Sequence, residues 1–218
     1  MSSLHDDSVA RTQAIDRHLI ADISLRAVTA VAFAAFAISA ISHWLAAPTR
    51  ITLLLLVVAN CFTTALVLVA RTPVRRDWRP LTLLWTLGGT YAFLFYNLNE
   101  GVKIVPEAVG ALLQIGGISW QLFAKISLKR SFGLLPANRG VVSRGAYRVV
   151  RHPMYLGYFI TDAGFLLTNF SLLNLSVHVF QVAFQIGRIV REEKILETDV
   201  AYRCYRNTVR YRLIPGVF

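Results

Sequence analysis

Residues 51–70 read ITLLLLVVANCFTTALVLVA, twenty consecutive positions without a charged side chain. A helix needs about 20 apolar residues to cross roughly 30 Å of hydrocarbon. Other apolar runs meet or approach that length at residues 24–46, 81–98, 106–127 and 172–190, and a shorter run at 154–170 is either a span or a tight hairpin arm. The pattern predicts an all-α, polytopic membrane bundle of about six transmembrane helices, with five as the alternative.

The composition agrees with this class. The 218 residues are 55% hydrophobic and 16% charged, and the mean hydropathy of +0.51 is too high for an ordinary soluble domain. We expect one integrated membrane domain. Residues 1–127 form its N-terminal segment and scaffold helices, and 128–218 supply a long loop, a helical hairpin and a cytoplasmic, partly amphipathic helix over 189–212.

The basic residues indicate the orientation. Of the 23 Lys and Arg residues, only Arg50 and Lys103 lie in the loops 47–50 and 99–105, and the other 21 lie on the opposite side. By the positive-inside rule, both termini are cytoplasmic. The net charge is +11, but the basic residues that produce it flank the spans and form no basic face on a soluble domain. No nucleic-acid partner is therefore expected. Heavy use of Ala, Arg and Leu favours a bacterial plasma membrane.

The two cysteines suggest no further structure. Cys61 lies inside an apolar run and Cys204 in the tail, so they form neither a disulfide framework nor a metal site. No metal is expected.

A polar stripe runs along the last apolar segment. Its members are spaced 4, 3, 4, 3 and 4 residues apart, a mean of 3.6 that places them on one helix face: Asn174, His178, Gln181, Gln185, Arg188 and Glu192. Polar groups that face lipid are costly, so this face lines a substrate channel or bonds neighbouring helices together. Six groups in register favour the channel, with Arg188 as the binding residue for an anionic acceptor.

Two other features carry candidate chemistry. Asp162 is an ionisable group inside an apolar run, and is either a functional group of the channel or a structural carboxyl. The segment Arg151-His152-Pro153-Met154-Tyr155-Leu156-Gly157 places Pro at a helix start, where free backbone N–H groups attract anions. Arg151 and His152 add donors, and Gly157 permits close approach. The alternative for this segment is an interfacial anchor.

Three blocks resemble the isoprenylcysteine carboxyl methyltransferase and phospholipid methyltransferase superfamily. They are GVVSRGAYRVVRHPMYLG at 140–157, RIVREEKIL at 188–196, and Tyr202, Tyr205 and Ile214-Pro215-Gly216 in the tail. The resemblance covers roughly residues 128–216, whereas the N-terminal spans resemble no family that we can name.

The resemblance implies a pocket for S-adenosylmethionine at the cytoplasmic surface, closed by the loop before the Arg-His-Pro motif and by the C-terminal helix. The cofactor contacts carried over are Arg139, Gly140, Val141, Val142, Tyr147, His152, Pro153, Met154 and Tyr155, completed by Glu192 and Glu193. Members that act on prenylcysteine commonly have His where this chain has Arg139, and Ser where it has Met154. The acceptor atom (carboxylate, thiol or amine) therefore stays open.

The residues suit this cofactor chemically. Arg151 or His152 can hold its carboxylate, and Glu192 or Glu193 can accept hydrogen bonds from its ammonium group or ribose hydroxyls. Tyr147 and Tyr155 offer aromatic faces. Methyl transfer depends mostly on positioning. A carboxylate or thiolate acceptor needs no general base, whereas an amine or hydroxyl needs one, for which Glu193 and Asp162 are candidates.

Three alternatives were weighed. A Rossmann-type methyltransferase is excluded because no strand precedes a Gly-rich turn. Membrane sterol reductases, which use NADPH, share the Arg-His-Pro start and a similar tail, but the Glu192-Glu193 pair favours a cofactor with net positive charge. A transporter or non-catalytic scaffold is the third alternative, disfavoured because the polar residues concentrate in one half of the chain.

The topology gives the first testable prediction. Cysteines introduced at Thr49 and Lys103 react with an impermeant thiol reagent added outside the cell, whereas one at Arg76 does not. Protection of Thr49 and Lys103 together with labelling at Arg76 is the pattern that contradicts the orientation.

Overall fold

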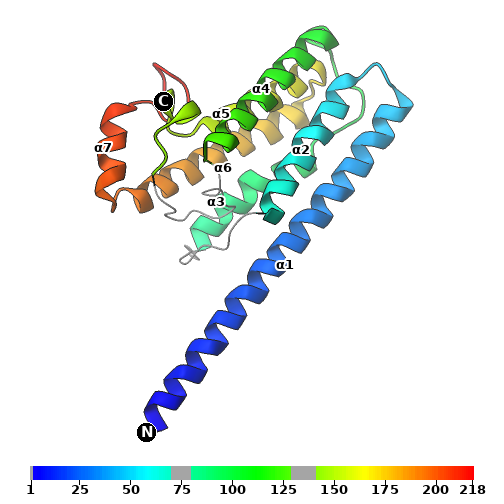
Figure 1. Cartoon of the computed structure of the whole chain (residues 1–218). Coiled ribbons are helices and arrows are strands. Elements are labelled where there is room, and N and C mark those ends of the chain that lie inside the picture. Colours follow the sequence, from blue (N-terminus) through cyan, green and yellow to red (C-terminus); the bar gives the residue numbers. More distant parts are fainter. Residues whose placement is uncertain (1, 70–79, 129–140) are drawn as a thin grey trace.

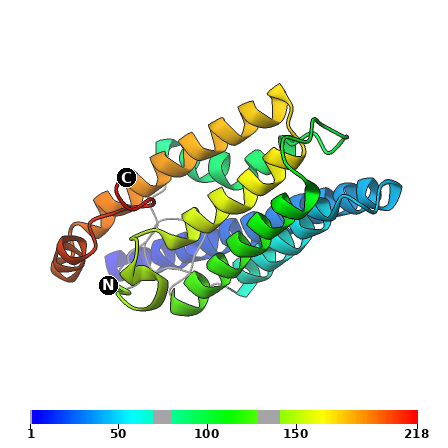
Figure 2. The same ribbon diagram turned by 90° about the horizontal axis from the view of Figure 1, so that it is seen from above.

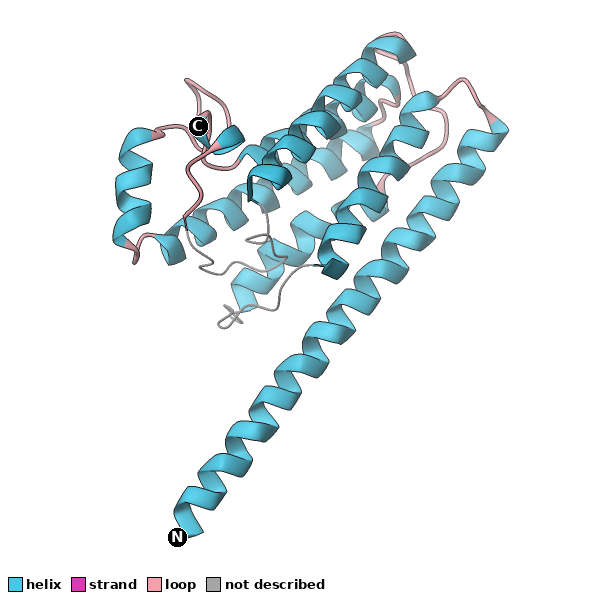
Figure 3. Cartoon of the chain, viewed as in Figure 1, coloured by secondary structure: helices cyan, strands magenta, loops and turns pink. Residues whose placement is uncertain are grey.

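The computed structural model describes residues 2–69, 80–128 and 141–218, with side chains outside 2–22 and 66–69. The expected all-α class is confirmed for this part of the chain. Its helices are α1 Ser2–Ala46, α2 Ile51–Val69, α3 Pro80–Tyr91, α4 Glu107–Leu128, α5 Pro153–Thr168, α6 Leu172–Leu196 and α7 Val200–Thr208. Two 3₁₀ turns, η1 Ala92–Phe95 and η3 Gly145–Arg148, accompany them (Figures 1 and 3).

The main helices pack side by side into a bundle (Figures 1 and 2). α4 has its largest interface with α5, α1 packs on α2, and α3 packs on α6. α1 is the longest helix, and its N-terminal part runs past the end of the bundle (Figure 1). The turn between α5 and α6 pairs with the segment before α4, because Val102 and Phe170 exchange two backbone hydrogen bonds of 2.9 Å each.

Among the described residues, only two helices are both long and apolar enough to cross a membrane, Ile23–Ala46 and Glu107–Leu128. The count of six spans is therefore not confirmed. Residues Ile51–Ala65 and Pro80–Phe95 are apolar but shorter. α5 has 16 residues, which rise only about 24 Å. It is one continuous helix, joined to α6 by a short turn.

The C-terminal helix differs from the prediction. A single helix over 189–212 was expected, but α6 continues to Leu196 and α7 starts afresh at Val200. The break falls at Glu197, Thr198 and Asp199, of which Thr and Asp are residue types that favour helix caps over helix interiors. The Asp199 side chain caps α7 by accepting a hydrogen bond of 2.8 Å from the Ala201 nitrogen.

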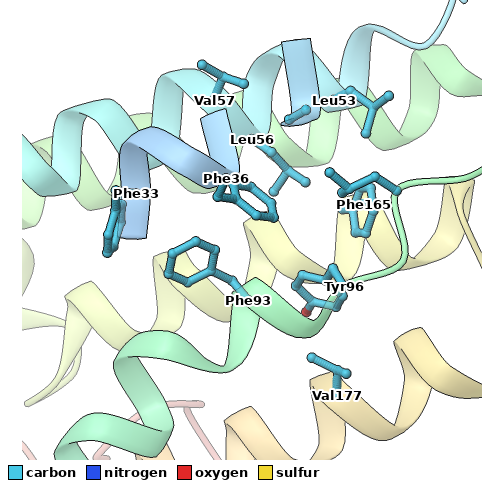
Figure 4. Close-up of a cluster of buried hydrophobic side chains, with 11 residues drawn as sticks. Phe33, Phe36, Leu53, Leu56, Val57, Phe93, Tyr96, Phe165 and Val177 are labelled. Carbon is cyan, nitrogen blue, oxygen red and sulfur yellow. The ribbon is translucent and has the colours of Figure 1, made fainter. Parts of the chain in front are cut away.

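An apolar core fills the middle of the bundle. Aromatic and aliphatic side chains from four helices and the η1 region meet there (Figure 4): Phe33, Phe36, Leu53, Leu56, Val57, Phe93, Tyr96, Phe165 and Val177. The Phe33 and Phe93 rings lie 4.5 Å apart, and Phe36 meets Phe93 edge to face at 4.8 Å. This core fixes α1 against α5 and α6, which carry the motifs of the second half of the chain.

Small residues let α4 and α5 approach closely. A side chain on Gly110 would lie 2.8 Å from the Gly164 oxygen, and one on Gly117 would lie 2.9 Å from the Gly157 oxygen. The two pairs are seven residues apart on each helix, so they repeat along one seam. The prediction that Gly157 permits close approach is explained here by a helix, since Gly117 and Gln121 of α4 are what it meets.

The glycine seam predicts that two neighbouring glycines respond differently to substitution by alanine. Gly117→Ala places a methyl group 2.7 Å from the Thr161 nitrogen, whereas Gly116→Ala meets nothing within 4 Å. We expect Gly117→Ala to lower the free energy of unfolding by about 1–3 kcal/mol, the usual effect of overpacking. Gly116→Ala should be neutral or stabilising by up to about 1 kcal/mol. Thermal unfolding in detergent measures both, and equal midpoints for the two variants would contradict the seam.

Candidate functional site

The α5 N-terminus meets the C-terminal segment of the chain (Figure 1). Pro153 is the first helical residue of α5 and His152 precedes it in a non-helical conformation. The backbone nitrogens of Arg151 and His152 donate to the Tyr211 and Arg212 oxygens at 2.9 and 2.8 Å. These two backbone donors hold residues 211–212 in place.

Glu193 organises this region. It is 2% exposed, and both its oxygens accept hydrogen bonds from cationic or ring donors. Arg151 Nε lies 2.7 Å from Oε1, His152 Nε2 lies 3.2 Å from Oε1, and Arg212 Nε lies 2.8 Å from Oε2. The third nitrogen of Arg151, Nη1, donates to the Val209 and Arg210 carbonyls. One carboxylate thus joins the start of α5, the end of α6 and the tail.

The charge state of Glu193 follows from these contacts. Burial alone raises the pKa of a carboxyl group, because it disfavours the ionised form. The hydrogen bonds from His152, Arg151 and Arg212 outweigh burial and hold the pKa of Glu193 well below its ordinary value of 4.5. Glu193 is therefore ionised at physiological pH.

Glu192 and its neighbours face a different environment. The Glu192 carboxylate is half-buried and accepts a hydrogen bond of 3.3 Å from the Tyr155 hydroxyl. The Arg188 guanidinium lies 5.5 Å from the centre of the Tyr155 ring. Three candidate residues from two separate motifs are thus brought together at one tyrosine.

The loop residues assigned to the cofactor pack against α7. Val141, Val142 and Tyr147 pack with Tyr202 and Tyr205 of α7, and the Tyr205 hydroxyl donates to the Tyr147 oxygen at 2.7 Å. Arg139 and Gly140 lie outside the described residues. Val141 lines a cavity next to α7, and Tyr155 lines a cavity between the helices.

A cavity opens between the helices next to Tyr155. The expected channel residues that line it are Asp162, Gln181, Gln185 and Arg188, together with Met154 and Tyr155. Gln181 Nε2 donates to Asp162 at 2.7 Å. Phe33, Leu56 and Phe93 give the opposite wall an apolar surface.

The residues of the polar stripe have two different surroundings along α6. Its C-terminal part, from Gln181 to Arg188, lines the cavity. Asn174 instead exchanges hydrogen bonds with the Asn97 backbone at 2.7 and 3.0 Å, which ties α6 to the segment after η1. His178 lies outside the cavity wall, with its ring 5.6 Å from Phe159 and its Nδ1 3.4 Å from the Tyr96 hydroxyl.

Residues 106–202 match the phospholipid methyltransferase family. The match confirms the resemblance to the wider superfamily that includes the isoprenylcysteine carboxyl methyltransferases. It covers α4, η3, α5, α6 and the start of α7. No curated protein matches the chain at a significant level.

The boundaries of the match differ from those expected. The resemblance was placed at 128–216, but the phospholipid methyltransferase match begins before α4 and ends at residue 202. The matched region includes α4, which packs closely on α5 along the glycine seam. The match supports a membrane methyltransferase and favours this class over the reductase and the transporter.

Several site residues escaped the sequence analysis. Asn60 and Thr63 of α2, Thr90 of α3 and Tyr158 of α5 line the cavity beside the methyltransferase motifs. The first two are three residues apart in a run of aliphatic residues, a weak signal that treating residues 51–70 as scaffold overlooked. Arg212 had no signal at all, since only the fold brings it to Glu193.

The Glu193 cluster gives the third prediction. Glu193→Gln leaves Arg151 and Arg212 without their negative partner, so we expect the free energy of unfolding to fall by about 3 kcal/mol or more. Glu192→Gln, with one long hydrogen bond at a half-buried site, should cost about 1.5 kcal/mol or less. Thermal unfolding checks both values, and a Glu193→Gln midpoint equal to that of Glu192→Gln would refute the assignment.

The pH dependence has a definite sign. Because the folded-state pKa of Glu193 is lowered, its ionised form stabilises the fold fully above about pH 4.5. That contribution is lost as the pH falls below this value toward the lowered pKa. The gap in thermal midpoint between the wild type and Glu193→Gln should therefore narrow between pH 5 and pH 3.

Proposed function

We propose that the protein is a membrane-embedded methyltransferase that uses S-adenosylmethionine and acts on a lipophilic acceptor with a polar head. The observation that carries the proposal is the phospholipid methyltransferase match over 106–202. The Arg-His-Pro start of α5 and the Glu192-Glu193 end of α6, 40 positions apart in the sequence, meet beside a cavity lined by the polar face of α6.

The donor set at Tyr155 suits the positive part of this cofactor. A half-buried carboxylate and an aromatic face are what ammonium and sulfonium groups favour. We assign these contacts to Glu192, Met154 and Tyr155. Arg139, Gly140, Val141, Val142 and Tyr147 remain proposed contacts of the loop before α5. The bound cofactor supplies an activated methyl group, so the residues act mainly by positioning.

Glu193, Arg151 and His152 receive a positioning role. Glu193 already accepts hydrogen bonds from three side chains, so its oxygens are poorly placed to take a further proton or ligand. Their shared contacts fix the end of α6, and so the direction in which Glu192 points. Pro153 and Gly157 set the start and the packing of α5.

Arg188 is the proposed catalytic contact with the acceptor. It lines the cavity next to Tyr155, so its guanidinium can hold an anionic or polar head close to the methyl group. An amine or hydroxyl acceptor also requires a proton acceptor. Asp162, in the same cavity and bonded to Gln181, is the proposed group.

We also propose that α1, α2, α3 with η1, α4, α5 and the apolar part of α6 are six spans, with both termini cytoplasmic. The short α5 and α3 segments fit a bilayer that thins locally or is completed by flanking residues. This topology places Glu192, Tyr155 and Arg188 near the cytoplasmic surface of a bacterial plasma membrane, where a soluble cofactor can reach them.

The function is tested by ligand binding and turnover on one set of purified proteins. Adenosylhomocysteine should raise the thermal midpoint of the wild type, whereas NADP should not, and Glu192→Gln should weaken adenosylhomocysteine binding about tenfold, equivalent to 1.4 kcal/mol. Arg188→Met and Gln185→Leu should reduce methyl transfer to a membrane extract and leave adenosylhomocysteine affinity unchanged. If NADP stabilises the protein and adenosylhomocysteine does not, the proposed methyltransferase function is wrong and a reductase function is favoured.

A further inference from the structure

Lys125 is a buried cation in the last turn of α4. Its side chain is 4% exposed. The Nζ atom lies 3.4 Å from the Thr63 hydroxyl, 4.6 Å from the centre of the Phe62 ring and 5.2 Å from that of Tyr158. In the described part of the chain, no carboxylate forms an ion pair with it. A buried charge without a counter-charge is unfavourable, and two aromatic faces compensate only in part.

This cation stands beside the cavity. Thr63 and Tyr158, two of its contacts, line the cavity wall. The Tyr158 ring lies 6.3 Å from the Tyr155 ring, and Arg188 lies against Tyr155. Two neighbouring tyrosines of α5 thus each contact one cation. Lys125 lies at Tyr158, and Arg188 lies at Tyr155.

A second donor points to the same chemistry. Asn60 also lines the cavity, three residues before Thr63 on α2, and its Nδ2 is buried without a hydrogen-bond partner. Thr63 donates its own proton to the Ala59 oxygen at 2.9 Å, so its hydroxyl accepts from Lys125. The Asn60 amide on this wall and the Lys125 ammonium beside it both have unused capacity as hydrogen-bond donors. Their preferred ligand is an anionic oxygen.

The opposite end of the cavity limits where an anion can bind. Asp162 lies one helical turn beyond Tyr158, about 6 Å further along α5. Its carboxyl group, bonded to Gln181, disfavours an anion at that depth. The favourable position is therefore the wall formed by α2 and α4.

We propose that Lys125 and Asn60 form an anion subsite that binds the phosphate or carboxylate group of the lipid acceptor. This inference rests on the proposed function and adds a second anchoring point to it. Arg188 acts at the reacting end, and Lys125 selects acceptors that carry a negative group. Neutral lipids of the same chain length are discriminated against because they leave the buried ammonium without its counter-charge.

The test compares three short lipids in an uncharged maltoside detergent. Dioctanoyl phosphatidate carries a phosphate, dodecanoate carries a carboxylate, and dioctanoylglycerol is the neutral match of the first. At least one anionic lipid should raise the thermal midpoint of the wild type, and the neutral lipid should not. The lipid that binds identifies the anionic group, whereas equal shifts from all three would overturn the subsite.

Variants separate a binding role from a structural one. Lys125→Met keeps the apolar stem, and we expect it to weaken binding of the anionic lipid at least tenfold without lowering the midpoint of the ligand-free protein. Lys125→Arg should retain most of the binding, and Asn60→Ala should weaken it. Lys103→Met is the matched control, since Lys103 is exposed and pairs with Glu100 at 3.2 Å. A lower midpoint with unchanged lipid binding in Lys125→Met would make Lys125 structural.

Adenosylhomocysteine binding distinguishes the two levels of failure. If the wild type is not stabilised by adenosylhomocysteine, the proposed function fails and the subsite fails with it. If adenosylhomocysteine stabilises the wild type and Lys125→Met equally, but anionic lipids bind both proteins alike, only the subsite is wrong.

Discussion

A single buried carboxylate holds the methyltransferase end of this protein together. Glu193 accepts hydrogen bonds from Arg151, His152 and Arg212, which belong to the start of α5 and to the tail, while Glu193 itself lies near the end of α6. Burying any of these charges alone would be unfavourable, so the segments are stable only together. Arg151 extends the connection by binding the Val209 and Arg210 carbonyls. Because this cluster fixes the end of α6, it also orients Glu192, the residue before Glu193. The Glu192 carboxylate accepts a hydrogen bond from the Tyr155 hydroxyl. Adjacent acidic residues thus support different tasks, one maintaining the geometry and the other left half-exposed beside the cavity.

The cavity is a joint product of both halves of the chain. α5 and α6 supply Asp162, Gln181, Gln185 and Arg188, whereas the earlier helices supply apolar walls and a few polar atoms. The family match covers only 106–202, so α1, α2 and α3 add their walls from outside the matched region. The matched region thus contributes most of the polar cavity wall, and the preceding helices contribute most of the apolar wall. Lys125 links the two parts, because it lies on a matched helix and contacts Thr63 and Phe62 of α2.

Close packing of α4 against α5 supports the candidate site. Gly110 and Gly117 of α4 lie against Gly164 and Gly157 of α5, so the helix backbones approach to a distance that a methyl group would prevent. In a membrane, where apolar burial gives no advantage over lipid, such contacts and the hydrogen bonds between helices provide the attraction. The bond of 2.9 Å between Gln121 and Thr161 crosses the same interface. The glycine seam therefore sets the position of α5 along α4, and with it the position of Tyr155 and Tyr158 relative to Lys125.

The sequence by itself determined the helical class, most helix positions and the residues of the family motifs, because apolar run length and the 3.6-residue period are local properties. The same reasoning placed the polar stripe on one face of α6. Only the tertiary structure decided that Gln181, Gln185 and Arg188 line a cavity while Asn174 binds the Asn97 backbone, since the partner of a polar group lies on another helix. It also divided 189–212 into two elements and brought Arg212 to Glu193, 19 positions away. Pairings of this kind depend on how separate segments pack, and no spacing within one segment encodes them.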